Sequence, residues 1–187
     1  NSAARFAVFN NNDKLTLAPD VTMRLLRSTK DVVGGDHDRY EQFYKGIKVV
    51  GPMAIVHSKN DQARSITGYI ENRLENLTVK PEINEKAAID ISRFMLADVL
   101  EKEDDMKLSG KISPKTEGIN LCIVNEYYPE THGKMVLAYE VIQSINVWNI
   151  PIKRTQYIDA ISGKPINSIN NIITHKSKGK GLSNFYG

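Results

Sequence analysis

Histidine is the residue type in this sequence that most directly suggests chemistry, and that chemistry would be metal-assisted hydrolysis. A zinc hydrolase of the His-Glu-x-x-His type carries two histidines four positions apart on one helix, with a glutamate that activates water. The chain has four histidines, His37, His57, His132 and His175, and no two of them have that spacing. Its single cysteine offers no cysteine cluster for a structural zinc. We therefore expect no metal site and no catalytic residues, with His57 and His132 as packed or surface side chains.

Other catalytic patterns are also missing from the sequence. The segment Gly179–Ser183, GKGLS, lacks the Gly-x-Ser-x-Gly order of a serine nucleophile elbow, and no Gly-x-x-x-x-Gly-Lys-Ser/Thr phosphate loop occurs. Cys122 lies in the apolar run 119–124, which predicts a buried and inert thiol. Asn76-Leu77-Thr78 forms a glycosylation sequon, a pattern short enough to arise by chance. These observations indicate that the chain is not an enzyme.

The composition is that of a soluble globular protein. Of 187 residues, 41% are hydrophobic and 25% are charged, and no run of about 18 apolar residues could span a membrane. The formal net charge of +3 equals the contribution of Lys176, Lys178 and Lys180, so the rest of the chain is close to neutral. We expect binding to neither nucleic acid nor membrane. The chain begins at Asn1 rather than at a methionine, which suggests that an upstream leader has been removed.

One helix stands out in the hydrophobic pattern, at 85–100, preceded by Asn84 as a candidate N-cap. A shorter helix is predicted from Ser2 to Phe9, where Ser2 is the candidate cap. The apolar face predicted for the longer helix consists of Ala87, Ala88, Ile91, Phe94, Met95 and Val99.

Segments rich in β-branched and apolar residues predict strands on both sides of the longer helix. The predicted strands lie at 23–28, 47–58 and 63–74 before the helix, and at 118–128, 133–148, 152–163 and 166–169 after it. The fold class expected is α+β. A break near Pro81 predicts two small tandem domains, 1–79 and 80–174, each an antiparallel sheet packed on a helix. Residues 175–187 are predicted to form an extended tail.

The stretch Tyr40–Gly51, YEQFYKGIKVVG, fits two structures. Tyr40, Phe43 and Tyr44 have helical spacing, whereas the alternation of Tyr40, Gln42 and Tyr44 with their neighbours suits a strand with two different faces. Periodicity alone does not decide between a helix and a hairpin.

A family resemblance favours the hairpin. The stretch YEQFYKGIKVVG, continued by AIVHSKNDQARSITGYI, resembles the propeptide domain of the fungalysin/thermolysin family, in which a glutamine-bearing strand enters a Tyr-Lys-Gly turn. Lys48 stands where that family usually has proline after the Gly-Ile pair, and Gly51-Pro52 is expected to kink the following strand. The residues that carry the resemblance are Tyr40, Gln42, Tyr44, Gly46, Val49, Gly51, Val56, His57 and Gly68.

The second half of the chain resembles the PepSY domain that follows in propeptides of thermolysin-like metallopeptidases. The matching segments are KMVLAYEVIQS and PIKRTQYIDAISGKPINSINNI. Glycines such as Gly46 and Gly163 allow positive φ at reversals, and Asp159 beside a turn can accept backbone N–H bonds. The residues that carry this second resemblance are Leu137, Ala138, Tyr139, Val141, Tyr157, Ile158, Asp159, Ala160, Gly163 and Ile166.

The resemblance implies a secreted or extracellular prodomain, with periplasmic transit, that acts as intramolecular folding chaperone and non-covalent inhibitor of its own metallopeptidase. It implies autoprocessing and a partner, the cognate mature peptidase domain, that carries zinc and calcium. Of the motif residues, Tyr40, Gln42, Gly46, Gly51, His57, Gly68, Tyr139, Asp159 and Gly163 are expected to serve the fold rather than a site.

The tail is the segment expected to contact the peptidase cleft. The residues concerned are Leu182, Ser183, Asn184, Phe185, Tyr186 and Gly187, with the Gly187 carboxylate near the partner's zinc. Two alternatives remain open from the sequence: the tail is an arbitrary linker, or the chain is a free-standing binding or inhibitor module that never belonged to a peptidase precursor.

Overall fold

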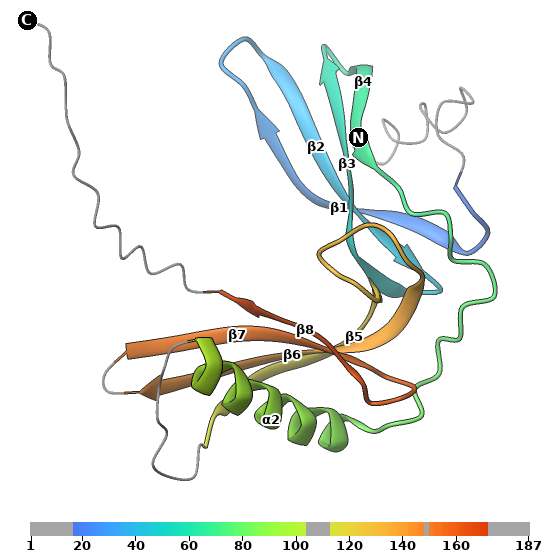
Figure 1. Cartoon of the computed structure of the whole chain (residues 1–187). Helices are drawn as coiled ribbons and strands as arrows, with labels where there is room; N and C mark the ends of the chain where they lie inside the picture. Colours follow the sequence, from blue (N-terminus) through green and yellow to red (C-terminus); the bar gives the residue numbers. More distant parts are fainter. Residues whose placement is uncertain (1–16, 104–112, 148–149, 172–187) are drawn as a thin grey trace, which may run out of the picture.

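The computed structural model describes residues 17–103, 113–147 and 150–171 (Figure 1). The predicted short helix from Ser2 to Phe9 and the predicted tail over 175–187 lie outside these ranges. Within them the chain forms one mixed eight-stranded sheet and one helix, in agreement with the predicted α+β class. The strands are β1 (Val21–Lys30), β2 (Gly35–Tyr44), β3 (Ile47–Lys59), β4 (Gln62–Tyr69), β5 (Lys115–Asn125), β6 (Met135–Val147), β7 (Ile150–Asp159) and β8 (Pro165–Asn170), and the helix is α2 (Glu85–Glu103).

The ambiguous stretch that begins at Tyr40 forms the β2–β3 hairpin. Tyr44 pairs with Ile47, and the two residues between them, Lys45 and Gly46, both have positive φ, at 47° and 83°. That conformation is typical of the two-residue turns that match the twist of antiparallel strands. Tyr40 and Gln42 lie on the inward face and are 2% and 0% exposed. The stretch therefore shows the two-residue alternation of a strand and not the spacing of a helix.

The sheet consists of two antiparallel halves joined by a narrow parallel contact. β3 pairs with β5 only through Lys48 and Val49, while its later residues pair with β4 along the same edge. Gly51, with a φ of 103°, and Pro52 lie between the two pairings and bend the strand. The N-terminal half (β1–β4) and the C-terminal half (β5–β8) therefore diverge beyond this contact (Figure 1). The stronger prediction, two tandem domains, stays a prediction.

Helix α2 covers one face of the C-terminal half (Figure 1). The Asn84 side chain caps it, because its Oδ1 accepts the Ala87 N–H at 2.9 Å. The buried residues of α2 are Ala88, Ser92, Leu96 and Leu100.

The predicted apolar face of α2 was rotated relative to the observed one. Phe94, assigned to the core by the sequence pattern, is 78% exposed, whereas Leu96 and Leu100, which that face omitted, are fully buried. These two leucines pack against Val147 and Ile152 near the ends of β6 and β7, and this packing fixes the helix rotation.

Two further expectations can be compared with the structure. The predicted buried thiol is confirmed, since Cys122 is 2% exposed and burial raises its pKa far above the ordinary value. The predicted strand over 63–74 was too long. β4 ends at Tyr69, and the chain then leaves the sheet for an irregular linker before α2.

Candidate functional site

A hydrogen-bonded junction fastens the end of β4 to β2. The side-chain amide of Gln42 accepts the Glu71 N–H at 2.9 Å and donates to the Glu71 carbonyl at 2.6 Å. Gln42 thus pairs with the backbone of Glu71 as a neighbouring strand would. Both residues are buried, at 0% and 7% exposure, so each of these polar groups depends on the other for its hydrogen bond.

The same Glu71 anchors an arginine that reaches across to the C-terminal half. Its carboxylate accepts hydrogen bonds from the Arg73 Nε at 2.9 Å and Nη2 at 2.6 Å. The Arg73 guanidinium also donates to the carbonyls of Thr131 and Gly133, both at 3.0 Å, in the loop between β5 and β6. We call the set Gln42, Glu71 and Arg73 the junction triad.

Electrostatics within the junction triad favour the ion pair. Hydrogen bonds from Arg73 hold the pKa of the Glu71 carboxyl below its ordinary value, against the opposing effect of burial. The Glu71 carboxylate in turn raises the pKa of Arg73. The triad therefore links β2 to the linker through neutral amide hydrogen bonds, and the linker to the β5–β6 loop through charge-assisted ones.

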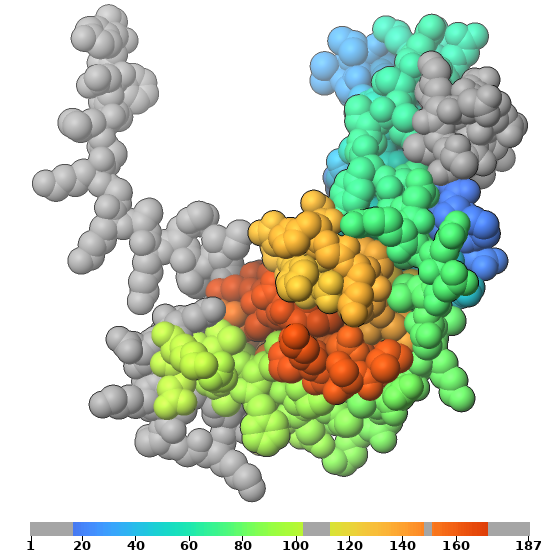
Figure 2. Space-filling view, turned by 45° about the vertical axis from the view of Figure 1, so that its right-hand side comes forward, coloured from blue at the N-terminus to red at the C-terminus, as the bar shows by residue number. Residues whose placement is uncertain are grey.

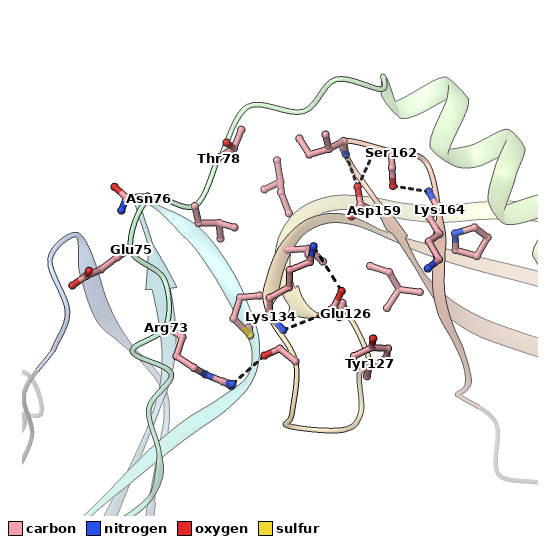
Figure 3. Close-up of a pocket in the computed structure, with 18 residues that line it drawn as sticks. Arg73, Glu75, Asn76, Thr78, Glu126, Tyr127, Lys134, Asp159, Ser162 and Lys164 are labelled. Carbon is pink, nitrogen blue, oxygen red and sulfur yellow. Dashed lines mark hydrogen bonds and ion pairs between the residues drawn. The ribbon is translucent and has the colours of Figure 1, made fainter.

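A cleft of about 870 Å³ opens beside this junction. Its walls come from the linker after β4, the loop between β5 and β6 and the turn between β7 and β8, which lie next to one another on one face of the molecule (Figure 2). Arg73, Glu126, Lys134 and Asp159 are among the charged side chains around it (Figure 3). The cleft is therefore a concavity of mixed polar and apolar lining between the linker and the C-terminal half.

The side chains that line the cleft are mostly engaged in shaping it. The Oδ1 of Asp159 accepts the N–H groups of Ile161 at 2.9 Å and Ser162 at 2.7 Å, as expected for an aspartate beside a turn (Figure 3). Glu126 and Lys134 close the loop at its base, where the Glu126 Oε1 accepts the Lys134 N–H at 3.1 Å. No group of three or more His, Cys, Asp or Glu residues that could hold a metal occurs within the described ranges.

His57 lies at some distance along β3 from the junction and faces His37 of β2. The two Nδ1 atoms are 2.7 Å apart, the His37 Nε2 lies 3.0 Å from the Asp31 carboxylate, and the His57 Nε2 lies 2.8 Å from the Thr67 hydroxyl. Because two N–H groups cannot face each other at that distance, one Nδ1 donates and the other accepts. Sequence reasoning assigned His57 to a packed or surface position and missed its partner, His37.

The remaining motif residues lie in the sheet and its turns. Gly68 has a φ of 102°, and a Cβ placed on it would lie 2.0 Å from the Met53 carbonyl oxygen, so no side chain fits there. The Tyr139 hydroxyl donates to the Ile83 carbonyl at 3.1 Å and ties the chain just before α2 to β6. The predicted cleft-binding residues Leu182–Gly187 lie outside the described ranges.

The structure has, in the part of the chain that it describes, no helix that is both long and apolar enough to cross a membrane.

Comparison with known proteins identifies the class of domain. Residues 21–70 match the Fungalysin/Thermolysin Propeptide Motif, so this segment, which comprises β1–β4, is a propeptide motif of that type. The chain is also 30% identical over 158 residues to thermolysin from Alicyclobacillus acidocaldarius subsp. acidocaldarius and to thermolysin from Bacillus caldolyticus, covering 84% of this chain and 27% of each relative. Neutral protease B of Bacillus subtilis (strain 168) is 33% identical over 147 residues, covering 75% of this chain and 24% of the relative.

These findings confirm the resemblance to propeptides of thermolysin-like peptidases. The chain spans about a quarter of the length of the curated relatives that it matches. The similarity extends well beyond the motif at 21–70, and the PepSY-like nature of the second half stays a prediction. The Bacillus megaterium YpeB C-terminal domain overlays with a TM-score of 0.40 at 11% identity, covering 90% of this chain and 63% of that one.

Proposed function

We propose that this chain is the prodomain of a secreted thermolysin-like zinc metallopeptidase, in which it acts as intramolecular folding chaperone and non-covalent inhibitor. The observation that carries the proposal is the match of β1–β4 to the propeptide motif, together with similarity to thermolysins over 84% of the chain. The cognate mature peptidase domain is the partner, and it supplies the zinc and the calcium. This chain contributes a binding surface and no catalytic group.

The chaperone activity follows from preferential binding to the folded peptidase. A ligand that binds the native state and not the unfolded state stabilises the native state by mass action, and covalent attachment of the ligand makes its effective concentration high. The junction triad supports this role, because it connects the two halves of the sheet through Gln42, Glu71 and Arg73. A prodomain whose halves keep a fixed relation can present an extended surface to its partner without a large ordering cost.

Inhibition is assigned to the C-terminal segment. In this proposal the domains 1–79 and 80–174 dock on the peptidase, and residues 175–187 run into the active-site cleft, with Leu182, Phe185 and Tyr186 in its subsites. Degradation of the prodomain by the peptidase releases the activity.

The test is to add the chain to its cognate mature peptidase and to measure peptide hydrolysis and recovery of activity after refolding. We expect inhibition and improved refolding by the full chain. A chain that ends at Thr174 should still bind and assist refolding but should inhibit less. Full peptidase activity at micromolar prodomain, together with no gain in refolding, would refute the proposal, and equal inhibition by the shortened chain would refute the role of the tail.

A further inference from the structure

One face of the N-terminal half carries a row of arginines that the fold does not neutralise. In the strand register Arg27 of β1 lies opposite Arg39 of β2, and Arg24 lies opposite Glu41. The same face continues through Ile55 of β3, which pairs with Arg39. We call Arg24, Arg27 and Arg39 the arginine row.

The fully buried side chains at the centre of the N-terminal half lie on the other face of the sheet. Tyr40, Ala54 and Val56 form a buried cluster there, and Leu17, the first described residue, packs against it. Arg24 and Arg27 are exposed and Arg39 is half-buried, so the described elements leave the face of the arginine row open to a partner.

The arginine row is electrostatically unfavourable in the isolated fold. Like charges that face each other across a strand pair destabilise a sheet, and Arg27 and Arg39 are such a pair. The Nε of Arg39 is buried and has no hydrogen-bond partner among the described residues. Arg24 lies over the Phe43 ring, 3.9 Å from its centroid, and this contact leaves its N–H edge available.

The nearby carboxylates are engaged elsewhere. Glu41 binds Lys48 at 2.6 Å, and Asp36 lies 3.9 Å from Lys30. Asp38 accepts a hydrogen bond from Ser28, and Asp31 pairs with His37 at 3.0 Å. Asp31 and Glu41 therefore pair with a histidine and a lysine rather than with the arginine row.

We propose that the arginine row is a docking surface for a cluster of carboxylates on the mature peptidase domain. This inference rests on the proposed prodomain function and names the chemistry of one of its contact surfaces. Guanidinium groups bind carboxylates through paired hydrogen bonds, so an acidic partner would neutralise the exposed Arg24 and Arg27 and relieve the Arg27–Arg39 repulsion. Binding is then favoured by relief of an unfavourable arrangement as well as by new contacts.

The observations favour an acidic protein surface over a nucleic acid. A nucleic-acid surface combines basic residues with free aromatic rings on which bases stack. Here Phe43, the aromatic ring nearest to the arginine row, is already covered by Arg24. Complementary charge at a protein interface mainly accelerates association and fixes orientation, so the arginine row would align the prodomain on the peptidase.

The test compares inhibition of the cognate peptidase by the full chain and by charge variants. Arg24→Gln together with Arg27→Gln removes two charges of the row, and Arg64→Gln is the matched control, because Arg64 is exposed on β4 and its neighbours Ala63 and Ser65 pair with β3 away from the row. We expect the double variant to associate about ten-fold more slowly in low salt and Arg64→Gln to behave like the parent chain. The difference should disappear in about 1 M salt, where charges are screened within a few ångströms.

Stability measurements separate a binding defect from a folding defect. Arg27→Gln should leave the melting temperature unchanged or raise it, because a like-charge pair is removed. An unchanged association rate for the double variant would overturn the arginine row as a docking surface while leaving the prodomain function intact. Failure of the parent chain to inhibit at all would instead refute the prodomain function. If Arg64→Gln slows association as much per removed charge as the double variant does, the effect is one of net charge only, and the arginine row is overturned as a docking surface. Tight binding of the parent chain to duplex DNA, lost in the double variant, would overturn the choice of partner.

Discussion

Replacing Gln42 with alanine should remove a large part of the free energy of unfolding. Gln42 is fully buried, and its amide makes both hydrogen bonds of the Glu71 backbone. In the variant the N–H and C=O groups of Glu71 lose their partners in a site that is 7% exposed. Each buried group left unpaired costs about 1–3 kcal/mol, and the lost side-chain volume adds about 1 kcal/mol. The expected loss is about 3–7 kcal/mol, against a typical domain stability of about 5–15 kcal/mol.

Urea unfolding, followed by circular dichroism and by tryptophan fluorescence, measures this loss. Gln62→Ala is the matched control, since Gln62 is exposed at the start of β4 and its replacement should change the free energy of unfolding by less than about 0.5 kcal/mol. Gln42→Glu keeps the shape but removes the donor to the Glu71 carbonyl and adds a buried charge. It should therefore destabilise the protein more at pH 7 than near pH 4, where the new carboxyl becomes protonated.

A small effect would refute the reasoning. If Gln42→Ala costs no more than Gln62→Ala, the two hydrogen bonds to Glu71 are replaced by water without loss, and the junction triad does not hold the end of β4. If the variant instead unfolds in two separate transitions in urea, the triad couples the unfolding of the two halves of the sheet.

Three further predictions concern the sheet, the ion pair and the helix. Gly68→Ala should destabilise the protein by more than about 2 kcal/mol in urea unfolding, because the φ of 102° and the carbonyl of β3 leave no room for a methyl group. The pKa of Glu71 is lowered in the folded state, so the ionised carboxylate stabilises the fold above the ordinary pKa of about 4.5. This stabilisation is lost as the pH falls below that value. Arg73→Gln should therefore flatten this part of a plot of the free energy of unfolding against pH. Phe94→Ser should leave the melting temperature nearly unchanged, whereas Leu96→Ala should cost about 2–5 kcal/mol, since only Leu96 is buried.

The sequence allowed most of the secondary structure to be predicted, because the relevant signals are local. The cap at Asn84 and the Lys45-Gly46 turn depend on neighbouring residues only. The rotation of α2 depends instead on which leucines meet Val147 and Ile152, and these partners are distant in the chain. The hydrophobic period in the sequence predicts which side of the helix is buried with an error of about one residue position. That error was enough to assign Phe94 to the core.

Strand register explains why the histidine pair was missed. The turn pairs Tyr44 with Ile47, and continuing that register along the hairpin would place Ala54 opposite His37. An irregularity between Glu41 and Phe43 shifts the pairing, and His57 faces His37 instead. Such a bulge depends on the fit of both strands to the rest of the sheet, so a sequence pattern in one strand does not reveal it.

The junction triad was also beyond sequence reasoning, although one of its members was singled out. Gln42 carries the family resemblance, but the sequence does not say that its partner is the backbone of Glu71, 29 residues further along the chain. The bend at Gly51 and Pro52 frees the edge of β3 for two different neighbours, and β4 then ends beside the loop that Arg73 reaches.

The narrow parallel contact between β3 and β5 makes the junction triad more than a local feature. Two residue pairs, Lys48 with Cys122 and Val49 with Ile123, join the halves of the sheet directly. So short a ladder resists bending weakly, because a few hydrogen bonds contribute only about 1 kcal/mol each. The arginine that spans from Glu71 to the β5–β6 loop adds charge-assisted bonds at a second point, away from that ladder. The halves also share one hydrophobic core, in which Tyr44 and Val49 belong to the same buried cluster as Ile123 and Leu137. Arg73 therefore adds a polar attachment, away from the ladder and the core, that helps to set the angle between the halves.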